Sequence, residues 1–520
     1  MNRSDMLSRL EGHTQPWDMV IVGGGATGVG VAVDAASRGY EVLLLEQSDF
    51  GKGTSSRSTK LVHGGVRYLE QGNISLVMEA LRERGLLRQN APHLVHDLGF
   101  VVPNYDWWEA PFYGLGLKVY NLLAGKYDFG PSQILSREQT LRLLPTIKTE
   151  GLRGGVIYYD GQFDDSRLLI NLVTTAAEQG ATLLNYFHVT QLTSGDDGFV
   201  NGVVARDLET GQECQIGARI VINAGGPFCD TIRHMADPQA PPLIAHSQGI
   251  HLVFDRSFLC GDSAIMVPHT SDGRVMFAIP WHGHTLVGTT DTPISAPSLE
   301  PVPTESEIEF ILTTARNYLA KAPTRSDILS AFAGIRPLVR SANSKNTAAL
   351  SRDHTIQIDG TGLLTITGGK WTTYRRMAED CVNQAAVLAR LPEEPSATGH
   401  LNIHGFHKYS ERFGTLADYG SDAPEILELI SSDDSLGKTL HPALPYCRAE
   451  VLWAVRSEMA RNVEDVLARR TRALFLNARA AIEMASLVAD LMANELGHEQ
   501  RWITDQVSGF TKTALGYLPS

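Results

Sequence analysis

The chain has 520 residues, of which 43% are hydrophobic and 20% are charged, so disordered and fibrous classes of protein are excluded. The 45 Lys and Arg against 58 Asp and Glu give a net charge of −13, which argues against nucleic-acid binding by the protein as a whole. Five scattered cysteines without a CxxC motif predict free thiols in a reducing cytosol and no metal site, and neither an apolar signal core nor a membrane-spanning apolar run is present.

Residues 18–46 are predicted to form a strand, a glycine turn, a helix and a second strand. Gly23, Gly25 and Gly28 satisfy the pattern G-x-G-x-x-G, in which they allow a tight turn, close approach of a pyrophosphate and packing of the helix on the strand. The helix then begins near Ala26 and Thr27, where free N–H groups favour phosphates. A chance glycine turn is the alternative, but the flanking strand and helix favour dinucleotide binding.

Glu46 ends the second strand, about 20 residues after the turn, at the usual place for an acid that holds a ribose hydroxyl. Because a carboxylate there repels a 2′-phosphate, NADP is disfavoured. The position of the turn near the start of the chain favours FAD over NAD only mildly.

Hydroxyl side chains crowd the stretch directly after this acid. Residues 51–70 read GKGTSSRSTKLVHGGVRYLE. A flavin ring edge needs several hydrogen-bond partners, and the backbone together with Thr54, Ser55, Ser56 and Ser58 can supply them. A solvated loop is the usual meaning of such a cluster, but its place after the acid favours a cofactor contact.

The rest of the chain continues with mixed elements. Helices are predicted near 75–95, 166–179, 305–320 and 373–389, residues 96–150 are expected to be rich in loops, and short strands between 246 and 293 suggest an antiparallel sheet. Strands at 216–223 and 362–367 end in glycine pairs. Residues 391–400 are predicted to be a linker, and residues 415–500 mostly helical. The seven Arg of residues 448–479 are expected on a solvated helix face, with Arg461–Glu464 and Asp465–Arg469 pairs, rather than at a lipid surface.

Several motifs together resemble the FAD-dependent, quinone-linked glycerol-3-phosphate dehydrogenases. They are TSSRSTKLVHGGVRYLE (54–70), PWHGHTLVGTTDT (280–292), FAGIRPLV (332–339), SRDH (351–354), TGGKWTTYRRMAE (367–379) and RRTRALF (469–475). The resemblance extends over nearly the whole chain. The departures are conservative: Phe332 and Ile335 replace the more usual Tyr and Val.

The resemblance implies an α/β fold of three parts. An FAD-binding, Rossmann-like domain of the glutathione-reductase and D-amino-acid-oxidase type is expected at 17–85, 150–245 and 335–390. A substrate domain with an antiparallel sheet is expected at 86–149 and 246–334, and a C-terminal all-α domain at 400–520.

Site residues follow from the motifs and the resemblance. Val189, Ala224, Gly225, Gly369, Thr372 and Thr373 are expected at the cofactor, the last three at a helix start facing the pyrimidine end of the flavin. The resemblance implies that Arg67, Tyr68, Arg336 and Lys370 contact substrate, with the two arginines as phosphate clamps. His63 is the preferred catalytic base and Lys370 the alternative, because an ordinary histidine pKa is about 6.5.

The expected reaction is oxidation of glycerol 3-phosphate to dihydroxyacetone phosphate, with hydride passing from C2 to FAD and electrons leaving to a quinone. The expected location is cytoplasmic, peripheral on the cytoplasmic face of the membrane, without nucleic acid as partner; a homodimer is left open. A glycerol-3-phosphate oxidase that uses oxygen, a related amine or amino-acid oxidase, and a non-catalytic flavin sensor are the alternatives. Loss of the His, Arg and Lys set would mark a sensor, yet all are present.

Overall fold

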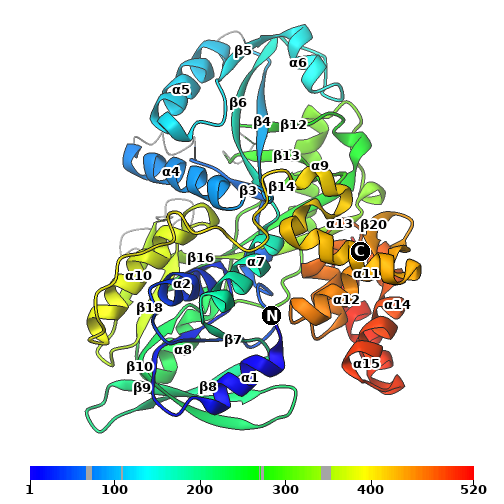
Figure 1. Cartoon of the computed structure of the whole chain (residues 1–520). Helices are drawn as coiled ribbons and strands as arrows, with labels where there is room; N and C mark the ends of the chain where they lie inside the picture. Colours follow the sequence, from blue (N-terminus) through cyan, green and yellow to red (C-terminus); the bar gives the residue numbers. More distant parts are fainter. Residues whose placement is uncertain (66–72, 107–108, 269, 271–273, 341–352, 520) are drawn as a thin grey trace.

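The computed structural model describes residues 1–520 except 66–72, 107–108, 269, 271–273, 341–352 and 520. Two large sheets lie one above the other in Figure 1, and the C-terminal helices pack against one side of both. The predicted architecture, a cofactor-binding α/β part, a second sheet and a C-terminal helical domain, is confirmed.

The first sheet carries the glycine turn. Its central strands are parallel and its order is β17-β18-β10-β1-β2-β7. In addition, β9 pairs with β10, and β8 pairs with β9. Residues 19–22 are buried apolar side chains without alternation, which is the pattern of a parallel strand covered on both faces. The strands are β1 (Trp17–Val22), β2 (Val42–Leu45), β7 (Thr182–Leu184), β8 (Phe187–Ser194), β9 (Val200–Asp207), β10 (Glu213–Asn223), β17 (His354–Ile358) and β18 (Leu364–Gly368).

Helices cover this sheet. α2 follows the glycine turn and contacts both α7 and α10, which places these three side by side against the parallel strands. The helices are α1 (Arg3–Gly12), α2 (Ala26–Ser37), α7 (Asp165–Glu178), α8 (Cys229–Ala236) and α10 (Tyr374–Leu388).

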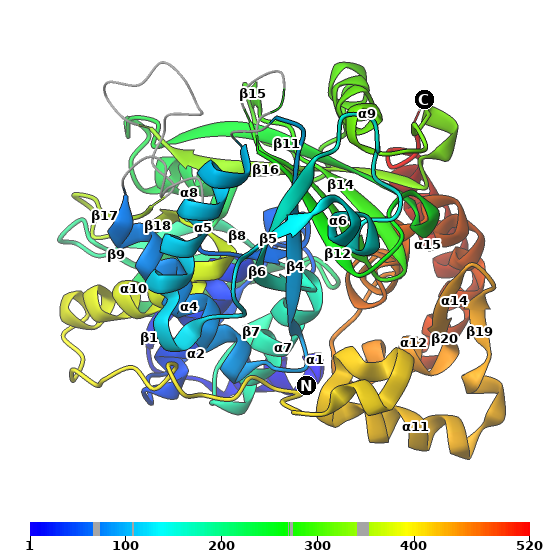
Figure 2. The same ribbon diagram turned by 90° about the horizontal axis from the view of Figure 1, so that it is seen from above.

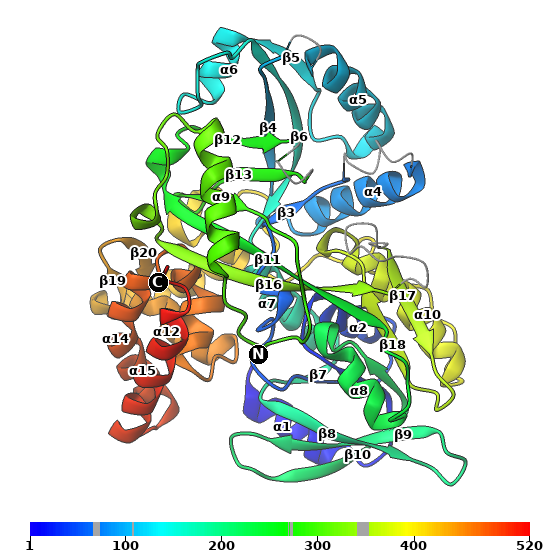
Figure 3. The ribbon, with the colours of Figure 1, turned by 180° about the vertical axis from the view of Figure 1, so that it is seen from behind.

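The second sheet has the order β15-β11-β14-β13-β12-β4-β6-β3, with β16 paired to β11 and β5 to β6. Its pairs are antiparallel except β4 with β12. Figure 3 shows α9 on this sheet, where it contacts β11 and β14. The elements are β3 (Leu61–Val62), α4 (Ile74–Asn90), β4 (Val95–Asn104), α5 (Glu109–Ala124), β5 (Gln133–Ser136), α6 (Arg137–Leu143), β6 (Gly154–Phe163), β11 (Ile244–Asp255), β12 (Ser263–Val267), β13 (Met276–Trp281), β14 (His284–Gly288), β15 (Thr292–Ile294), α9 (Glu305–Tyr318) and β16 (Ser330–Val339).

The structure corrects two expectations in this region. Residues 96–150 contain two strands and two helices where loops were expected, because glycine and proline within α5 weaken its helical pattern. Residues 154–163 were expected in the cofactor domain, yet β6 pairs with β4 and β3 of the second sheet, and β16 crosses the expected boundary at 335. We therefore propose that β6 and all of β16 belong to the substrate domain.

The C-terminal domain is mainly helical, with one small hairpin. Figure 2 shows it on the side of the molecule opposite to α4, α5 and α10. Its helices share one hydrophobic core with Trp281 and Phe332 of the second sheet. The elements are η8 (Ser410–Asp422), α11 (Ala423–Ser432), η9 (Asp434–Gly437), β19 (Thr439–His441), β20 (Leu444–Cys447), α12 (Arg448–Ser457), the π-helical turn η10 (Asp465–Arg470), α13 (Ala473–Leu476), α14 (Ala478–Leu496) and α15 (Gln500–Leu515).

The expectation of a solvated arginine face in this domain is wrong at its centre. Arg469, Arg470 and Arg472 are each at most 3% exposed. Asp465 and Arg469 do form an ion pair, 2.7 Å long, but inside the protein, and Arg461 pairs with Glu209 rather than with Glu464. Within the described parts of the chain, none of the helices combines the length and hydropathy needed to cross a bilayer.

Candidate active site

A cavity of about 430 Å³ lies where the carboxyl ends of the first sheet meet β3, β11 and β16 of the second sheet. The structure brings most of the predicted site residues together there. Those that line it are Gly23, Gly25, Ala26, Thr27, Glu46, Thr54, Ser55, Ser58, His63, Val189, Ala224, Gly225, Arg336, Gly369, Lys370 and Thr372. Gly28, Ser56 and Thr373 lie behind this lining, and Arg67 and Tyr68 lie outside the described residues.

The glycine turn forms one end of the cavity. Gly23 has a φ of 116°, a left-handed conformation that favours glycine, and a side chain on Gly28 would overlap the carbonyl oxygen of Gly23. α2 then begins at Ala26 without a side-chain cap from Gly25; the Ala26 N–H donates to the Ser55 hydroxyl, and the other N–H groups of the first turn are left for a ligand in the cavity. An uncapped helix start of this kind suits a pyrophosphate.

Glu46 is held rigidly at the end of β2. Its carboxylate accepts hydrogen bonds from the backbone N–H of Gly24 at 2.6 Å and of Ser48 at 2.9 Å. Burial raises the pKa of this carboxyl, and the two backbone donors oppose that rise. The side chain therefore lies where the sequence predicts a ribose contact, which stays a prediction.

The hydroxyl cluster mostly serves the protein itself. Thr54 donates to the carbonyl of Ile335 at 2.5 Å, and Ser58 donates to Asp165 at 2.7 Å. The Ser55 hydroxyl accepts from the N–H of Ala26 at 2.9 Å. These hydrogen bonds fix the loop that joins the two sheets. The hydrogen-bond partners that the loop still offers to a flavin are therefore largely its backbone groups.

The turn after β18 closes the other side. The short helix η7 (Trp371–Thr373) precedes α10, and the indole N–H of Trp371 donates to the carbonyl of Ser55 at 2.8 Å. The Thr372 hydroxyl accepts from the N–H of His63 at 3.2 Å. Lys370 and His63, far apart in the sequence, therefore line the same end of the cavity.

Arg336 is oriented before any ligand arrives. Its guanidinium donates to the carbonyl of Thr290 at 3.0 Å and to the hydroxyl of Thr289 at 3.1 Å, and lies 3.4 Å from Asp291. A side chain at Gly249 would occupy the space that this guanidinium takes. The fixed fork of donors suits an anionic group.

His251 is the site residue that sequence reasoning missed. It lies on β11 two positions after Gly249, so both face the cavity, and its Nε2 forms a 3.0 Å hydrogen bond with the Thr59 hydroxyl. Its ring stacks on Phe332 with centroids 5.0 Å apart. Burial, then the charges of Lys60 and Arg336, hold the pKa of His251 well below its usual value, so the ring is neutral at pH 7. Alternation along β11 towards Gly249 was the available signal.

Comparison with known proteins agrees with this site. A family profile described as "FAD dependent oxidoreductase" matches residues 18–375, and one described as "C-terminal domain of alpha-glycerophosphate oxidase" matches residues 361–502. The chain is 41% identical to a probable mitochondrial glycerol-3-phosphate dehydrogenase of Caenorhabditis elegans, over 99% of this chain and 76% of that protein. It is 40% identical to the mitochondrial glycerol-3-phosphate dehydrogenase of Homo sapiens, over 93% of this chain and 71% of that protein.

A solved structure extends the likeness to the fold. The glycerol-3-phosphate dehydrogenase from Bacillus halodurans, complexed with FAD, superposes with a TM-score of 0.81 at 30% identity, covering 99% of this chain and 98% of that one. Sequence and fold thus agree over all three parts of the molecule. The chain belongs to the family of FAD-dependent glycerol-3-phosphate dehydrogenases.

Proposed function

We propose that this chain oxidises sn-glycerol 3-phosphate to dihydroxyacetone phosphate with FAD as its cofactor. The observation that carries the proposal is a single cavity with a pyrophosphate-binding turn at one end and Arg336, Lys370 and two histidines at the other. The uncapped start of α2 and the carboxylate of Glu46 fit the dinucleotide half of FAD. When bound, FAD supplies the acceptor for the hydride from C2.

The residues at the substrate end divide the remaining work. Arg336 binds the phosphate dianion, because its guanidinium is fixed and a quarter exposed to the cavity. Lys370 stabilises the charge that develops on the C2 oxygen. His63 accepts the proton of the C2 hydroxyl, while His251, neutral and held by Thr59, lines the same end of the cavity.

Flavin bleaching tests this function directly. The purified yellow protein is mixed with sn-glycerol 3-phosphate without oxygen, and the flavin absorbance is followed. We expect bleaching with this substrate and much less with glycerol, which has no phosphate for Arg336. Equal bleaching by an amine or amino acid would instead support the amine-oxidase alternative.

We further propose that electrons leave to a quinone. The family name of the relatives, dehydrogenase, supports this assignment, whereas the profile of the C-terminal domain carries the description of an oxidase and does not discriminate. The reduced protein is divided between air-saturated buffer and an anaerobic solution of a short-chain quinone. Faster recovery of colour with the quinone supports the proposal, and faster recovery with oxygen contradicts it.

Peripheral membrane attachment is proposed on an exposed apolar surface of the substrate domain. Leu122 is 81% exposed on α5, and Lys118 and Lys126 are exposed nearby. Further exposed apolar side chains on α4, α5 and β5 are Ile74, Met78, Val119 and Ile134. A lipid surface would cover the apolar side chains while the lysines meet anionic head groups.

Flotation with anionic lipid vesicles tests this attachment, with Leu122→Asp as the variant and Val387→Asp on α10 as the control. Leu122→Asp should reduce the fraction that floats, and Val387→Asp, also at an exposed position, should not. Equal flotation of both variants and the wild type would contradict the assigned surface.

The oligomeric state needs a separate experiment. Sedimentation of the purified protein distinguishes a monomer from the homodimer that the sequence left open.

A further inference from the structure

Residues 49–60 run along the cavity from the ribose end, after Glu46, to the substrate end, before His63. Gly51, Lys52, Thr54, Ser55 and Thr59 all line the cavity. Apart from one short 3₁₀ turn (η1, Thr54–Ser56), the segment has no regular secondary structure. Such a segment needs contacts from other parts of the molecule to keep one conformation.

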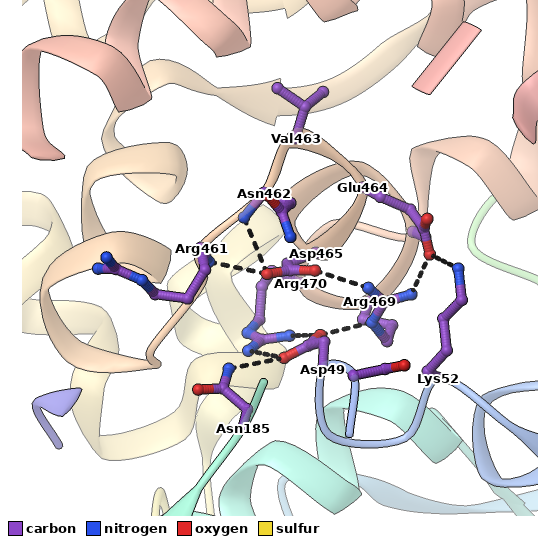
Figure 4. Close-up of polar contacts among 12 residues, drawn as sticks. Asp49, Lys52, Asn185, Arg461, Asn462, Val463, Glu464, Asp465, Arg469 and Arg470 are labelled. Atoms are coloured by element: carbon purple, nitrogen blue, oxygen red, sulfur yellow. Dashed lines mark hydrogen bonds and ion pairs between the residues drawn. The ribbon is translucent and has the colours of Figure 1, made fainter. Parts of the chain in front are cut away.

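The first set of contacts comes from the C-terminal domain, at the π-helical turn η10. Arg469 donates to Asp49 Oδ2 at 2.5 Å, and Arg470 donates to Oδ2 at 2.7 Å and to Oδ1 at 3.0 Å (Figure 4). Burial works to raise the pKa of Asp49, but Arg470 and Arg469 outweigh it and hold that pKa at about 2. Asp49 is therefore a charged, doubly clamped anchor at the start of the segment.

Glu464, the residue directly before this turn, reaches the cavity wall. Its carboxylate accepts a hydrogen bond from Arg469 at 2.8 Å and another from Lys52, and Figure 4 shows these side chains converging. Lys52 also lies 3.0 Å from Glu300. A residue of the cavity lining is thus held in place by side chains outside the cavity.

The second set of contacts lies farther along the segment. Arg472 donates to the carbonyl of Ser56 at 2.8 Å and to Asp165 at 3.2 Å. Asp165 in turn accepts from the backbone and hydroxyl of Ser58 at 3.0 and 2.7 Å and from Lys60 at 2.6 Å. Lys60 also donates to the carbonyl of Ser56 at 2.9 Å, so Arg472 and Lys60 hold the same carbonyl of the segment and the same carboxylate, Asp165.

Lys60 and Arg472 both have an unusual backbone conformation. Their left-handed φ values, 64° and 61°, are unfavourable for residues other than glycine and persist only where contacts hold them. The Lys60 ammonium also lies 5.2 Å from the Phe332 ring centre and 5.5 Å from that of Phe475 on α13. The side chains of two domains therefore enclose it.

The contact chain ends inside the cavity. Thr59, next to Lys60, bonds His251, and His251 stacks on the same Phe332 ring that faces Lys60. A shift of the Ser56–Lys60 backbone would move the Thr59 hydroxyl and with it the orientation of His251.

We propose that the residues Arg469, Arg470 and Arg472 of the C-terminal domain are positioning residues for the flavin and for the Thr59–His251 pair. They hold the 49–60 segment in the one conformation that the cofactor and substrate need, although none of them lines the cavity. The inference rests on the proposed function for its kinetic consequence, and on the geometry alone for its consequence on FAD binding.

Arg472 is the residue to test. Arg472→Met keeps an unbranched side chain and removes the guanidinium that bonds Ser56 and Asp165, and Arg472→Lys keeps the charge with a shorter, single donor group. At saturating sn-glycerol 3-phosphate, flavin reduction should slow by about 10- to 100-fold in Arg472→Met with KM changed far less, because misplaced reacting groups affect the chemical step. Arg472→Lys should recover part of the rate.

Arg38→Met is the matched control. Arg38 is also buried, pairs with Asp34 and donates to the carbonyl of Glu394, at the end of α2 opposite to the glycine turn, so it touches neither residues 49–60 nor the arginines that hold them. It should lower the melting temperature like Arg472→Met and leave the rate of flavin reduction near that of the wild type. Equal slowing in both variants, or a wild-type rate in flavin-loaded Arg472→Met, would overturn the proposal.

Two readouts do not depend on turnover. Titration of the apoprotein with FAD should give weaker binding for Arg472→Met than for Arg38→Met, and the flavin absorbance bands should change shape only in Arg472→Met. If wild-type flavin is not bleached by sn-glycerol 3-phosphate, the proposed function fails while these two measurements still decide the positioning role. Should Arg472→Met not fold, Arg472→Lys carries the same comparison with a smaller expected effect, and wild-type FAD affinity and bands in it would contradict the proposal.

Discussion

At the scale of single residues, the substrate end of the cavity gathers His63, His251, Arg336 and Lys370. The Arg336 guanidinium is oriented by Thr289 and Thr290 before a ligand binds, so little reorganisation is needed to meet a phosphate. Three of these four residues could be predicted, because each stands in a motif with glycines beside it. His251 was missed, because its signal, the alternation with Gly249 along β11, points to the cavity only once β11 has folded against β16.

Arg336→Ala should mainly impair binding of the substrate phosphate. Loss of an Arg–phosphate contact from a partly buried site costs roughly 2 to 4 kcal/mol, or about 30- to 1,000-fold in kcat/KM. Steady-state kinetics with glycerol should show a much smaller loss, because glycerol never used this contact. A loss with glycerol as large as that with glycerol 3-phosphate would place Arg336 at the flavin or at the C2 oxygen instead.

His63→Ala should lower the rate of flavin reduction by about 100-fold or more with both substrates, because proton removal is needed for each. Since a base must be deprotonated to act, the rate should fall towards low pH in the wild type, and this acidic limb should disappear in the variant. Stopped-flow reduction between pH 5 and 9 measures it. If the limb persists in His63→Ala and is lost in His251→Ala, the proton acceptor is His251; if both variants keep it, Lys370 takes that role.

At the scale of elements, the first βαβ unit and the glycine pairs after β10 and β18 were predictable because each strand ends in glycines that the turn geometry requires. The strands of the second sheet were predicted as a group, but the pairing of β6 was not. Its residues, GGVIYYDGQF, have no feature that selects β4 rather than the first sheet as partner. Partner choice for a strand depends on the faces that other segments cover, which no local pattern contains.

Gly25→Val should abolish retention of FAD. The φ of Gly25 is −85°, which a side chain tolerates, so the effect comes from space: a Cβ there would lie 3.0 Å from the Ser55 hydroxyl and against the bound pyrophosphate. The ratio of flavin to protein after purification measures the effect. Gly116→Val on α5, where nothing lies within 4 Å, is the control. A normal flavin ratio in Gly25→Val would show that the pyrophosphate lies elsewhere.

At the scale of the whole molecule, the C-terminal domain is held to the cofactor-binding part by buried charges rather than by a hydrophobic face alone. Arg167–Glu458, Arg470–Asp49 and Arg472–Asp165 all cross this interface. Sequence reasoning expected solvated arginines there, because spacing of i and i+4 charges looks the same on a surface helix and at an interface. The partners come from residues hundreds of positions away, so only the folded chain identifies them.

A second contact between the C-terminal domain and the cofactor-binding part should make the free energy of unfolding depend on pH. His404 bonds Glu178 at 2.7 Å and Asp422 at 2.8 Å. Burial works to lower the pKa of His404, but the two carboxylates outweigh it and raise that pKa to about 9. The stabilisation is therefore fully present below about pH 6.5, the unfolded value, and is lost as pH rises through about 9.

Denaturant unfolding of the wild type and of His404→Gln at pH 6 and pH 9.5 tests this. We expect the variant to lose about 1 kcal/mol in free energy of unfolding at pH 6, a value reduced by the partial exposure of the pair, and almost nothing at pH 9.5. An equal difference between the two proteins at both pH values would show that the imidazole charge contributes no stability.

A single anaerobic turnover shows whether this chain oxidises sn-glycerol 3-phosphate at C2 with its flavin as the hydride acceptor. The flavin-loaded protein is mixed with one equivalent of the substrate, and the bleached flavin and the product are both quantified. We expect one dihydroxyacetone phosphate per flavin reduced, and slower bleaching when the C2 hydrogen is replaced by deuterium. Bleaching without dihydroxyacetone phosphate, or a flavin that stays oxidised with excess substrate, would contradict it.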